Sequence, residues 1–248
     1  MRRFFTEPQN IIAGKASIYE DARHISQVLR MTTGDEILIF DGTGKEYTAK
    51  LTEIQKNVCY AEILGENISL SEPKTAITLF QGLPKSGKME TIIQKAVELG
   101  VSRIVPVEME RCVTRINSKK AGEEKAARWN KVSLEASKQC GRGKVPEVLE
   151  PVTFEKAISE IKKAKLSIMP YEELGHEGKL GLKELLKNNS SADDIAIVVG
   201  PEGGFSESEV SLAKEAGINM VGLGKRILRT ETVASAVIPV IMFERDEF

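Results

Sequence analysis

The chain has 248 residues, enough to bury a substantial hydrophobic core as one large domain or two smaller ones. Its 35 basic and 36 acidic side chains give a net charge of −1, which excludes a protein coated uniformly with positive charge. Three scattered cysteines and two histidines, His24 and His176, supply neither a disulfide framework nor a zinc site, and we expect no metal.

The first residues, MRRFFTEPQN, include two arginines but no apolar segment follows them, and no run of about 18 apolar residues occurs in the chain. We therefore expect a cytoplasmic protein with no membrane segment.

Between Ile11 and Leu70, short apolar runs alternate with turns: GDEILIFDGTGKEYTAKLTEI predicts two strands around a glycine-rich turn, and NVCYAEILG predicts a third. Residues 1–70 are thus predicted to form a small β-rich domain, followed by a polar linker.

From residue 76 onward, strand patterns alternate with helix patterns. Strands are expected at 76–81, 103–108, 166–171, 194–200 and 220–224, and helices at 87–99, around Trp129, at 154–164, 182–189 and 206–217, and from about Glu231. Ser206 and Glu209 have the spacing of a capping box. Such alternation predicts that residues 76–248 form an α/β domain, a parallel sheet with helices on both faces.

The segment GLPKSGK, residues 82–88, has the spacing of a phosphate loop, which makes a nucleotide hydrolase one alternative. Position 89 argues against it, because a phosphate loop needs a hydroxyl there to bind magnesium and Met89 offers only a thioether.

Positive charge is concentrated in the middle of the chain. Residues 76–145 carry 14 basic and 7 acidic side chains, whereas the segments before and after them are both net negative. This excess is consistent with a phosphate-binding face, because neutralising phosphates releases counterions, or with the solvated surface of a helix.

Two glycine-bearing loops follow predicted strands: GPEGG at 200–204 and GLGKRILRT at 222–230. Ligands of open parallel sheets bind at the carboxyl ends of the strands, where glycine lets the backbone approach them closely. These loops are either ordinary tight turns or parts of one ligand site.

The segments GPEGGFSESEV, LGKRILRTETVASAV, KMETIIQKAVELGVSRIVPV, ERC, KQCGR, MRRFF and HISQVLRM together resemble the RsmE family. That resemblance, over about residues 1–245, implies a PUA-like β-barrel followed by a SPOUT-type methyltransferase domain with a trefoil knot. It also implies S-adenosylmethionine as cofactor and N3 of a uridine in 16S ribosomal RNA of the small ribosomal subunit as the methylated atom. Gln27 departs from the family, whose members often carry arginine there.

The resemblance places the cofactor against three walls, formed by Gly200, Pro201, Glu202 and Gly203, by Leu223 and Gly224, and by Ile227, Leu228 and Thr230. Arg229 is a candidate to stabilise negative charge on the uracil, and Glu231 is a candidate proton acceptor or a group that orients Arg229; a structural ion pair is the alternative for both.

For RNA, the resemblance implies recognition by the first domain through Arg2, Arg3, Arg23, His24 and Arg30. We expect phosphate contacts from Lys85, Lys88, Arg111, Arg115 and Arg142. The apolar segment TVASAVIPVIMF and the usual state of SPOUT domains predict a homodimer. An RNA-binding assembly factor without catalysis is a further alternative.

Overall fold

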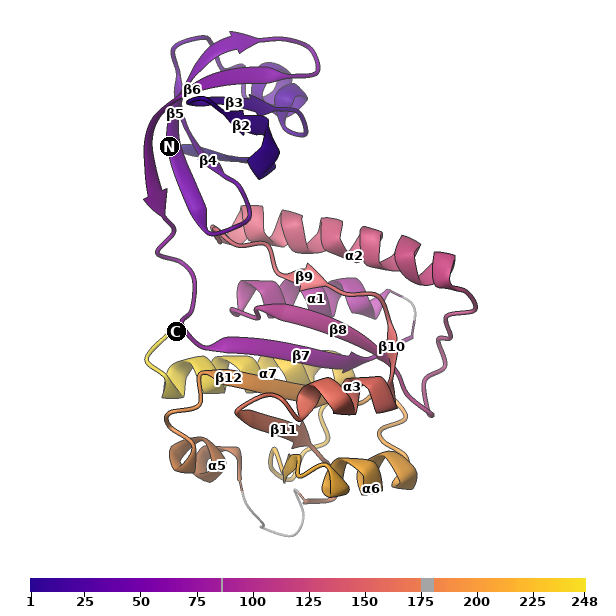
Figure 1. Cartoon of the computed structure of the whole chain (residues 1–248). Coiled ribbons are helices and arrows are strands. Elements are labelled where there is room, and N and C mark those ends of the chain that lie inside the picture. Colours follow the sequence, from indigo (N-terminus) through magenta and orange to yellow (C-terminus); the bar gives the residue numbers. More distant parts are fainter. Residues whose placement is uncertain (86, 175–180) are drawn as a thin grey trace. The chain divides into compact units, whose positions relative to one another are not determined.

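The chain divides into two units that are not contiguous in sequence. The computed structural model describes residues 1–85, 87–174 and 181–248. Unit 1 comprises Met1–Glu72 and Ser137–Val145, and unit 2 comprises Pro73–Ala136 and Pro146–Phe248 (Figure 1). The chain thus leaves unit 1 within the predicted linker, and a later segment of nine residues, Ser137–Val145, belongs to unit 1 again.

Unit 1 is a curled, mixed β-sheet with the strand order β1-β4-β5-β6-β3-β2. Strands β1 and β4 are parallel, and the other pairs are antiparallel. The hydroxyl of Thr6, just after β1, donates to the Ser17 carbonyl in β3 at 2.6 Å, which brings distant parts of the sheet together. The elements are β1 (Arg2–Phe5), β2 (Ile11–Ile12), β3 (Lys15–Ile18), β4 (Glu36–Phe40), β5 (Lys45–Ile54) and β6 (Cys59–Ile68), with one short helical turn at Pro8–Asn10 and another at His24–Val28.

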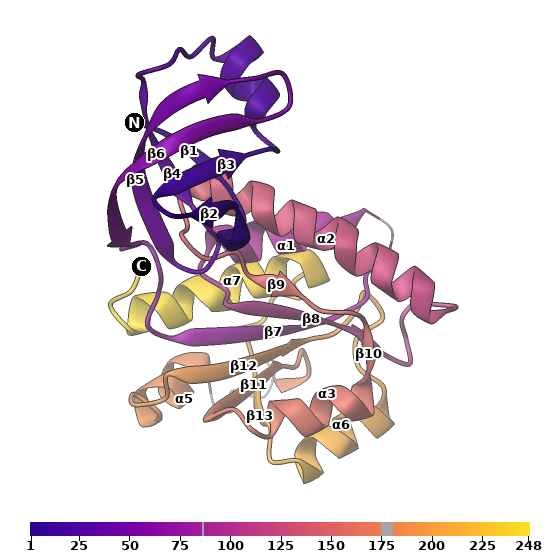
Figure 2. The same ribbon diagram turned by 45° about the horizontal axis from the view of Figure 1, so that its top comes forward.

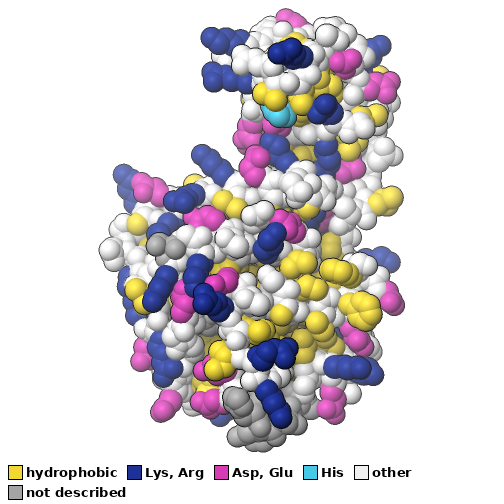
Figure 3. All heavy atoms as spheres, turned by 180° about the vertical axis from the view of Figure 1, so that it is seen from behind, with side chains coloured by type: hydrophobic (Ala, Val, Ile, Leu, Met, Phe, Trp, Pro, Cys, Tyr) yellow, Lys and Arg dark blue, Asp and Glu magenta, His cyan; other side chains and the backbone are white. Residues whose placement is uncertain are grey.

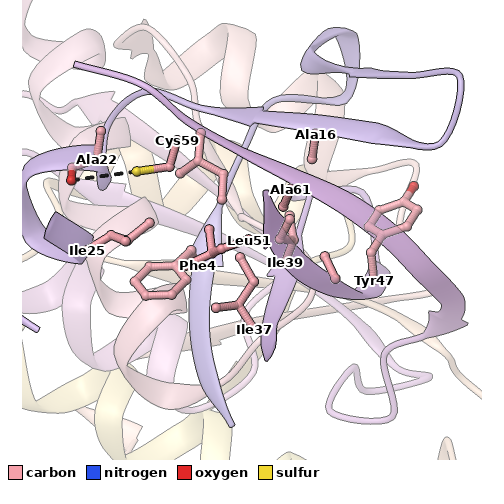
Figure 4. Packing of buried hydrophobic residues seen from close by; sticks show 12 residues of the cluster. Phe4, Ala16, Ala22, Ile25, Ile37, Ile39, Tyr47, Leu51, Cys59 and Ala61 are labelled. Atoms are coloured by element: carbon pink, nitrogen blue, oxygen red, sulfur yellow. Dashed lines mark hydrogen bonds between the residues drawn. The ribbon is translucent and has the colours of Figure 1, made fainter. Parts of the chain in front are cut away.

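The core of unit 1 lies inside this curled sheet (Figure 4). Ile37 and Ile39 alternate along β4 and are both fully buried, as expected for a strand with one face on the core. They pack in one cluster with Phe4 from β1 and with Leu51 from β5. The predicted strands β4, β5 and β6 are confirmed, whereas β1, which carries two arginines, was not predicted.

A buried ion pair anchors the segment that returns to unit 1. Arg142 is 5% exposed, and its Nη2 lies 2.7 Å from Oε2 of Glu72. The backbone amide of Lys144 also donates to Glu72, at 2.9 Å. Burial acts to raise the pKa of Glu72, but the hydrogen bonds from Arg142 and Lys144 outweigh it, and the pKa is lowered. This pairing argues against the predicted phosphate contact of Arg142.

Arg3 is also held inside unit 1. Its Nη2 donates to Oε1 of Glu46 at 2.8 Å and to the Arg142 carbonyl at 2.6 Å. The guanidinium carbon lies 3.8 Å from the centre of the Phe40 ring, a cation–π contact. These contacts give Arg3 a structural role and argue against the predicted RNA contact.

Replacing Arg142 with Met should lower the free energy of unfolding by about 3–5 kcal/mol, because Glu72 would remain buried without its cation. The parent should also gain stability as pH rises through the folded-state pKa of Glu72, which is lowered, and lose it as pH falls through that value; the variant should lack most of this dependence. Urea unfolding followed by circular dichroism at several pH values measures both. Lys56→Met, at an exposed position, is the control; equal losses in the two variants would contradict the assignment.

Unit 2 is built on a fully parallel sheet, as predicted, with the order β10-β8-β7-β12-β11-β13 and with β9 also beside β8. The central strands are continuous apolar runs because both of their faces are buried. Strands β9 and β10 were not predicted, since two residues each leave no pattern. The strands are β7 (Ala76–Gly82), β8 (Arg103–Glu108), β9 (Glu147–Val148), β10 (Val152–Thr153), β11 (Leu166–Pro170), β12 (Asp194–Val199) and β13 (Asn219–Val221).

Helices cover both faces of this sheet, which confirms the predicted layering (Figure 1 and Figure 2). Helix α7 packs against α1 and α5 on one face, and α3 contacts α6 on the other. The predicted capping box at Ser206 and Glu209 is present at the start of α6. The helices are α1 (Lys88–Glu98), α2 (Lys119–Cys140), α3 (Phe154–Ile161), α5 (Leu182–Asn188), α6 (Glu207–Glu215) and α7 (Thr230–Glu244).

Hydrogen bonds hold the last residues of the chain beside the first residues of unit 2. The carboxylate of Glu247 accepts hydrogen bonds from the amides of Lys74 and Thr75, at 2.6 and 3.0 Å, and from the Thr75 hydroxyl at 2.8 Å. The segment after α7 is thereby held beside the start of β7. Among the described residues, no helix has the length and apolar character needed to cross a membrane.

Candidate active site

A cavity of about 510 Å³ lies at the carboxyl edge of the unit 2 sheet. The loops after β11, β12 and β13 form most of its lining, and the first turns of α1, α6 and α7 and Arg111 from the loop after β8 complete it. This is the position expected for a ligand of a parallel sheet, and the volume suits a small organic cofactor. All the residues predicted to bind the cofactor line this one cavity: Gly200, Pro201, Glu202, Gly203, Leu223, Gly224, Ile227, Leu228 and Thr230. Arg229 lines it as well.

The loop after β12 requires glycine at position 203. A Cβ atom placed there would lie 2.9 Å from Cβ of Arg111 and 3.1 Å from its carbonyl oxygen. Arg111 in turn donates from Nη1 to the Gly203 carbonyl at 3.2 Å. The backbone therefore passes so close to the loop after β8 that any side chain would push the cavity wall out of place.

The glycines of the apparent phosphate loop have structural reasons unrelated to phosphate. A Cβ atom at Gly82 would lie 2.7 Å from the Pro201 nitrogen, so the end of β7 packs directly on the loop after β12. Gly87 has a φ of 86° at the start of α1, a conformation that glycine adopts without strain.

Lys88 joins two of the cavity's walls through carboxylates. Its Nζ lies 3.0 Å from Oε1 of Glu202 and 3.1 Å from Oε2 of Glu231. The hydrogen bonds to Glu202 and Glu231 raise the pKa of Lys88. The backbone hydrogen bond at the start of α7 lowers the pKa of Glu231, and the hydrogen bond from Lys88 adds to this effect. Glu231 is therefore an ionised, weakly basic carboxylate whose ion-pair partner is Lys88.

A chain of hydrogen bonds lies behind the cavity wall. The hydroxyl of Thr230, the first residue of α7, donates to the Gly200 carbonyl at 2.7 Å. The same hydroxyl accepts from Nε2 of Gln81 at 2.9 Å. Sequence reasoning did not single out Gln81, which stands at the end of an apolar run and lacks any motif.

Sequence reasoning also missed the loop after β11, although the rule that ligands bind at the carboxyl ends of strands could have indicated it. Pro170, Tyr171, Glu172 and Glu173 all line the cavity. Burial and the hydrogen bond with Glu173 raise the pKa of Tyr171 to about 12, so its hydroxyl stays protonated. The Tyr171 amide donates to the Val221 carbonyl at 2.9 Å, which joins the ends of β11 and β13.

The residues predicted to contact RNA differ in how far they are exposed to solvent. Four of those in unit 1 are exposed: Arg2, Arg23, His24 and Arg30. In unit 2, Lys85, Arg111 and Arg115 are exposed.

Cysteine and histidine side chains offer little for metal binding in the part of the chain that the structure describes. Each of the three cysteines is a thiol rather than half of a disulfide, and Cys59 and Cys112 are buried. His176 lies outside the described residues. Within 1–85, 87–174 and 181–248, no group of three or more histidine, cysteine, aspartate or glutamate side chains is placed to hold a metal ion.

Comparison with known proteins agrees with this arrangement. Residues 71–242 match the family model described as RNA methyltransferase domain, and residues 20–64 match the RNA methyltransferase PUA domain. The chain is 30% identical to ribosomal RNA small subunit methyltransferase E of Bacillus subtilis, over 99% of this chain and 98% of that protein. It is 32% identical to the protein of that name from Aquifex aeolicus, over 80% of this chain and 82% of that one.

Solved structures of related proteins share the fold. Ribosomal RNA small subunit methyltransferase E from Neisseria gonorrhoeae, bound to S-adenosyl methionine, has 36% identity and a TM-score of 0.83 over 98% of this chain and 97% of that chain. A probable rRNA-methyltransferase from Porphyromonas gingivalis has 28% identity and a TM-score of 0.82 over 99% of each chain.

The parallel sheet with its cavity at the carboxyl edge, preceded by a PUA-like unit, defines an RNA methyltransferase. More particularly, the chain belongs to the family of ribosomal RNA small subunit methyltransferase E, which confirms the resemblance found in its motifs. The trefoil knot stays a prediction.

Replacing Lys88 with Gln should raise the pKa of Glu231, because the positive charge that helps to lower it would be lost. Carbon NMR titration of the glutamate carboxylates measures this change. Lys85→Gln is the matched control, since the contact of Lys85 with Glu202 is made by its backbone amide and would persist. Equal pKa values of Glu231 in the two variants would contradict the role given to Lys88.

Proposed function

We propose that this protein transfers the methyl group of S-adenosylmethionine to N3 of a uridine in 16S ribosomal RNA of the small ribosomal subunit. The observation that carries the proposal is the single cavity lined by every residue that the family motifs assign to the cofactor. The related Neisseria protein was solved with S-adenosyl methionine bound.

The cavity suits this cofactor because its walls offer close backbone and apolar surface. Position 203 leaves no room for a side chain. Gly224 has a φ of +94°, so the loop after β13 takes a conformation that other residues rarely adopt. Leu223, Ile227 and Leu228 add apolar contacts to the lining. We assign these residues to hold the adenosyl and methionine parts. When bound, the cofactor supplies an electrophilic methyl group, and the protein supplies orientation.

The site must also stabilise the negative charge that develops on the uracil base. Uridine N3 carries a weakly acidic hydrogen that must leave, so negative charge develops on the uracil oxygens. Arg229 is exposed at the cavity, just before α7, and we assign it to stabilise that charge. The lowered pKa of Glu231 and its pairing with Lys88 make it a poor proton acceptor, so we assign it to hold the start of α7 instead. The target uridine must be unpaired or flipped out to reach the cavity.

RNA recognition is assigned to the exposed cations. Arg2, Arg23, His24 and Arg30 on unit 1 would bind the RNA near the target, and Lys85, Arg111 and Arg115 on unit 2 would contact phosphates. Lys88 is not among them, because its ammonium group already bridges two carboxylates. Residues 1–70 and 76–248 would thus correspond to an RNA-binding and a methyltransferase domain.

Replacing Gly203 with Val should abolish S-adenosylmethionine binding and methylation, because the Cβ atom would collide with Arg111. Calorimetry measures binding, and mass analysis of nucleosides from 16S RNA incubated with the protein measures N3-methyluridine. Gly65→Val in β6, where a Cβ meets nothing within 4 Å, is the control. The proposal would be contradicted if the Gly203→Val variant methylated RNA at the parent rate. It would also be contradicted if the parent bound the cofactor without methylating RNA, a result that would favour an assembly factor.

A chelator should leave the methylation activity of the parent unchanged.

We also propose that the protein acts as a homodimer through the outer face of α7. Apolar side chains gather in a patch on unit 2 (Figure 3). The inner face of α7 is buried within its own subunit, but Phe243 and Val240 on its outer face are 73% and 42% exposed. A second copy would cover these side chains and remove apolar surface from water.

Sedimentation at micromolar concentration should therefore give about twice the chain mass of 27.3 kDa. Phe243→Glu should shift the protein toward the monomer, whereas Leu212→Glu on α6, also an exposed apolar position, should not. A parent protein that sediments with a mass near 27.3 kDa would contradict the proposed homodimer.

A further inference from the structure

Gln81 is a polar side chain in a fully buried position. It stands near the carboxyl end of β7, is 0% exposed, and follows Phe80, which is 2% exposed. An amide at such a position loses its hydration and must be hydrogen-bonded within the protein to avoid a large cost. The nitrogen of the Gln81 amide donates hydrogen bonds, whereas its oxygen, Oε1, is buried without a hydrogen-bond partner. An apolar residue would fill the space without this cost, so the bonds donated by the nitrogen indicate the role of the amide.

The amide of Gln81 controls the direction of a hydrogen bond in the cavity wall. Its Nε2 donates to the Thr230 hydroxyl at 2.9 Å. A hydroxyl has one proton to donate, and since Thr230 accepts from Gln81, that proton is directed to the Gly200 carbonyl at 2.7 Å. Thr230 and Gly200 both line the cavity, whereas Gln81 does not. Gln81 therefore acts on the cavity only through these neighbours.

The same nitrogen also holds the end of its own strand. Nε2 of Gln81 donates to the Gly82 carbonyl at 3.0 Å. Gly82 packs directly on Pro201, since a Cβ atom there would lie 2.7 Å from the Pro201 nitrogen. One side chain thus links three segments: the end of β7, the loop after β12 and the first residue of α7.

We propose that Gln81 is a positioning residue for the cofactor site. By keeping the Thr230 hydroxyl as a donor to Gly200, it holds two walls of the cavity at the spacing the cofactor needs, without touching the cofactor. The inference rests on the proposed function, because it takes S-adenosylmethionine as the ligand.

Two variants of Gln81 separate the donated hydrogen bond from simple filling of space. Gln81→Met keeps the length of the side chain but removes the donor. Gln81→Leu also removes the donor but differs from Gln81→Met in shape, so similar losses in the two variants point to the hydrogen bond rather than to packing. Thr230→Val removes the hydroxyl that relays the effect, and Thr230→Ser retains it.

The test is a double-mutant cycle on the full chain, with S-adenosylmethionine affinity measured by calorimetry and the melting temperature recorded for each variant. We expect Gln81→Met, Gln81→Leu and Thr230→Val each to weaken binding about tenfold, the loss of one buried hydrogen bond. Thr230→Ser should bind like the parent. Gln81→Met in the Thr230→Val background should cause a smaller loss than it causes in the parent, because the relay is already broken and only the hydrogen bond to Gly82 remains to be lost.

Each other outcome overturns a specific statement. If the parent does not bind S-adenosylmethionine, the proposed function is wrong. If the parent binds and Gln81→Met binds within about twofold of it, or if the losses from Gln81→Met and Thr230→Val simply add, Gln81 does not act through Thr230 and the inference is wrong. If neither Gln81 variant folds, Gln81 serves the stability of the core and the inference is likewise wrong.

Discussion

The parallel pairing of β7 with β12 is the interaction on which the rest of unit 2 depends. Its register runs from Ala76 opposite Asp194 to Gln81 opposite Val199. Because both strands end at the same edge, the loop after β12 begins beside the end of β7. Gly82 can then pack on Pro201, and Lys88 at the start of α1 can reach Glu202. A slip of this register would separate all of these contacts at once.

The pairing also explains why the site is assembled from residues far apart in the sequence. The loops after β11 and β13 and the start of α7 add further walls, and Thr230 of α7 is joined to the Gly200 carbonyl. The walls are thus held by hydrogen bonds and an ion pair between segments, while the glycines supply the close approach. Rigid support of this kind keeps a cofactor and a base in line, which is the main contribution a protein makes to methyl transfer.

Much of this could be predicted where the determining interactions are local. The capping box at Ser206 involves residues three positions apart, and the apolar runs of β7 and β12 follow from burial on both faces. The glycine loops marked the cavity because glycine is needed where chains approach closely. The order of the strands, the very short β9 and the return of Ser137–Val145 to unit 1 depend on distant contacts that leave no local pattern. Gln81 was missed for the same reason.

Charge in the sequence proved a poor guide to free charge on the surface. Part of the basic excess at 76–145 is used in ion pairs, such as Arg128 with Glu90 at 3.0 Å and Arg142 with Glu72 at 2.7 Å. The first pair includes an exposed arginine and can exchange its partner for a phosphate at little cost, whereas the second is buried and cannot. Burial, which a sequence does not display, decides whether a cation can meet RNA.

The fastening of Glu247 to Lys74 and Thr75 has a consequence for synthesis of the chain. The two ends of this contact are 173 residues apart in sequence. At translation rates of about 5–20 residues per second, Glu247 is made roughly 10–35 s after the amides at the start of β7 to which it binds. During most of that time the nascent chain also lacks β12, so the edge of β7 that pairs with β12 stays open. Until β12 is made, this apolar edge is available for pairing with other strands.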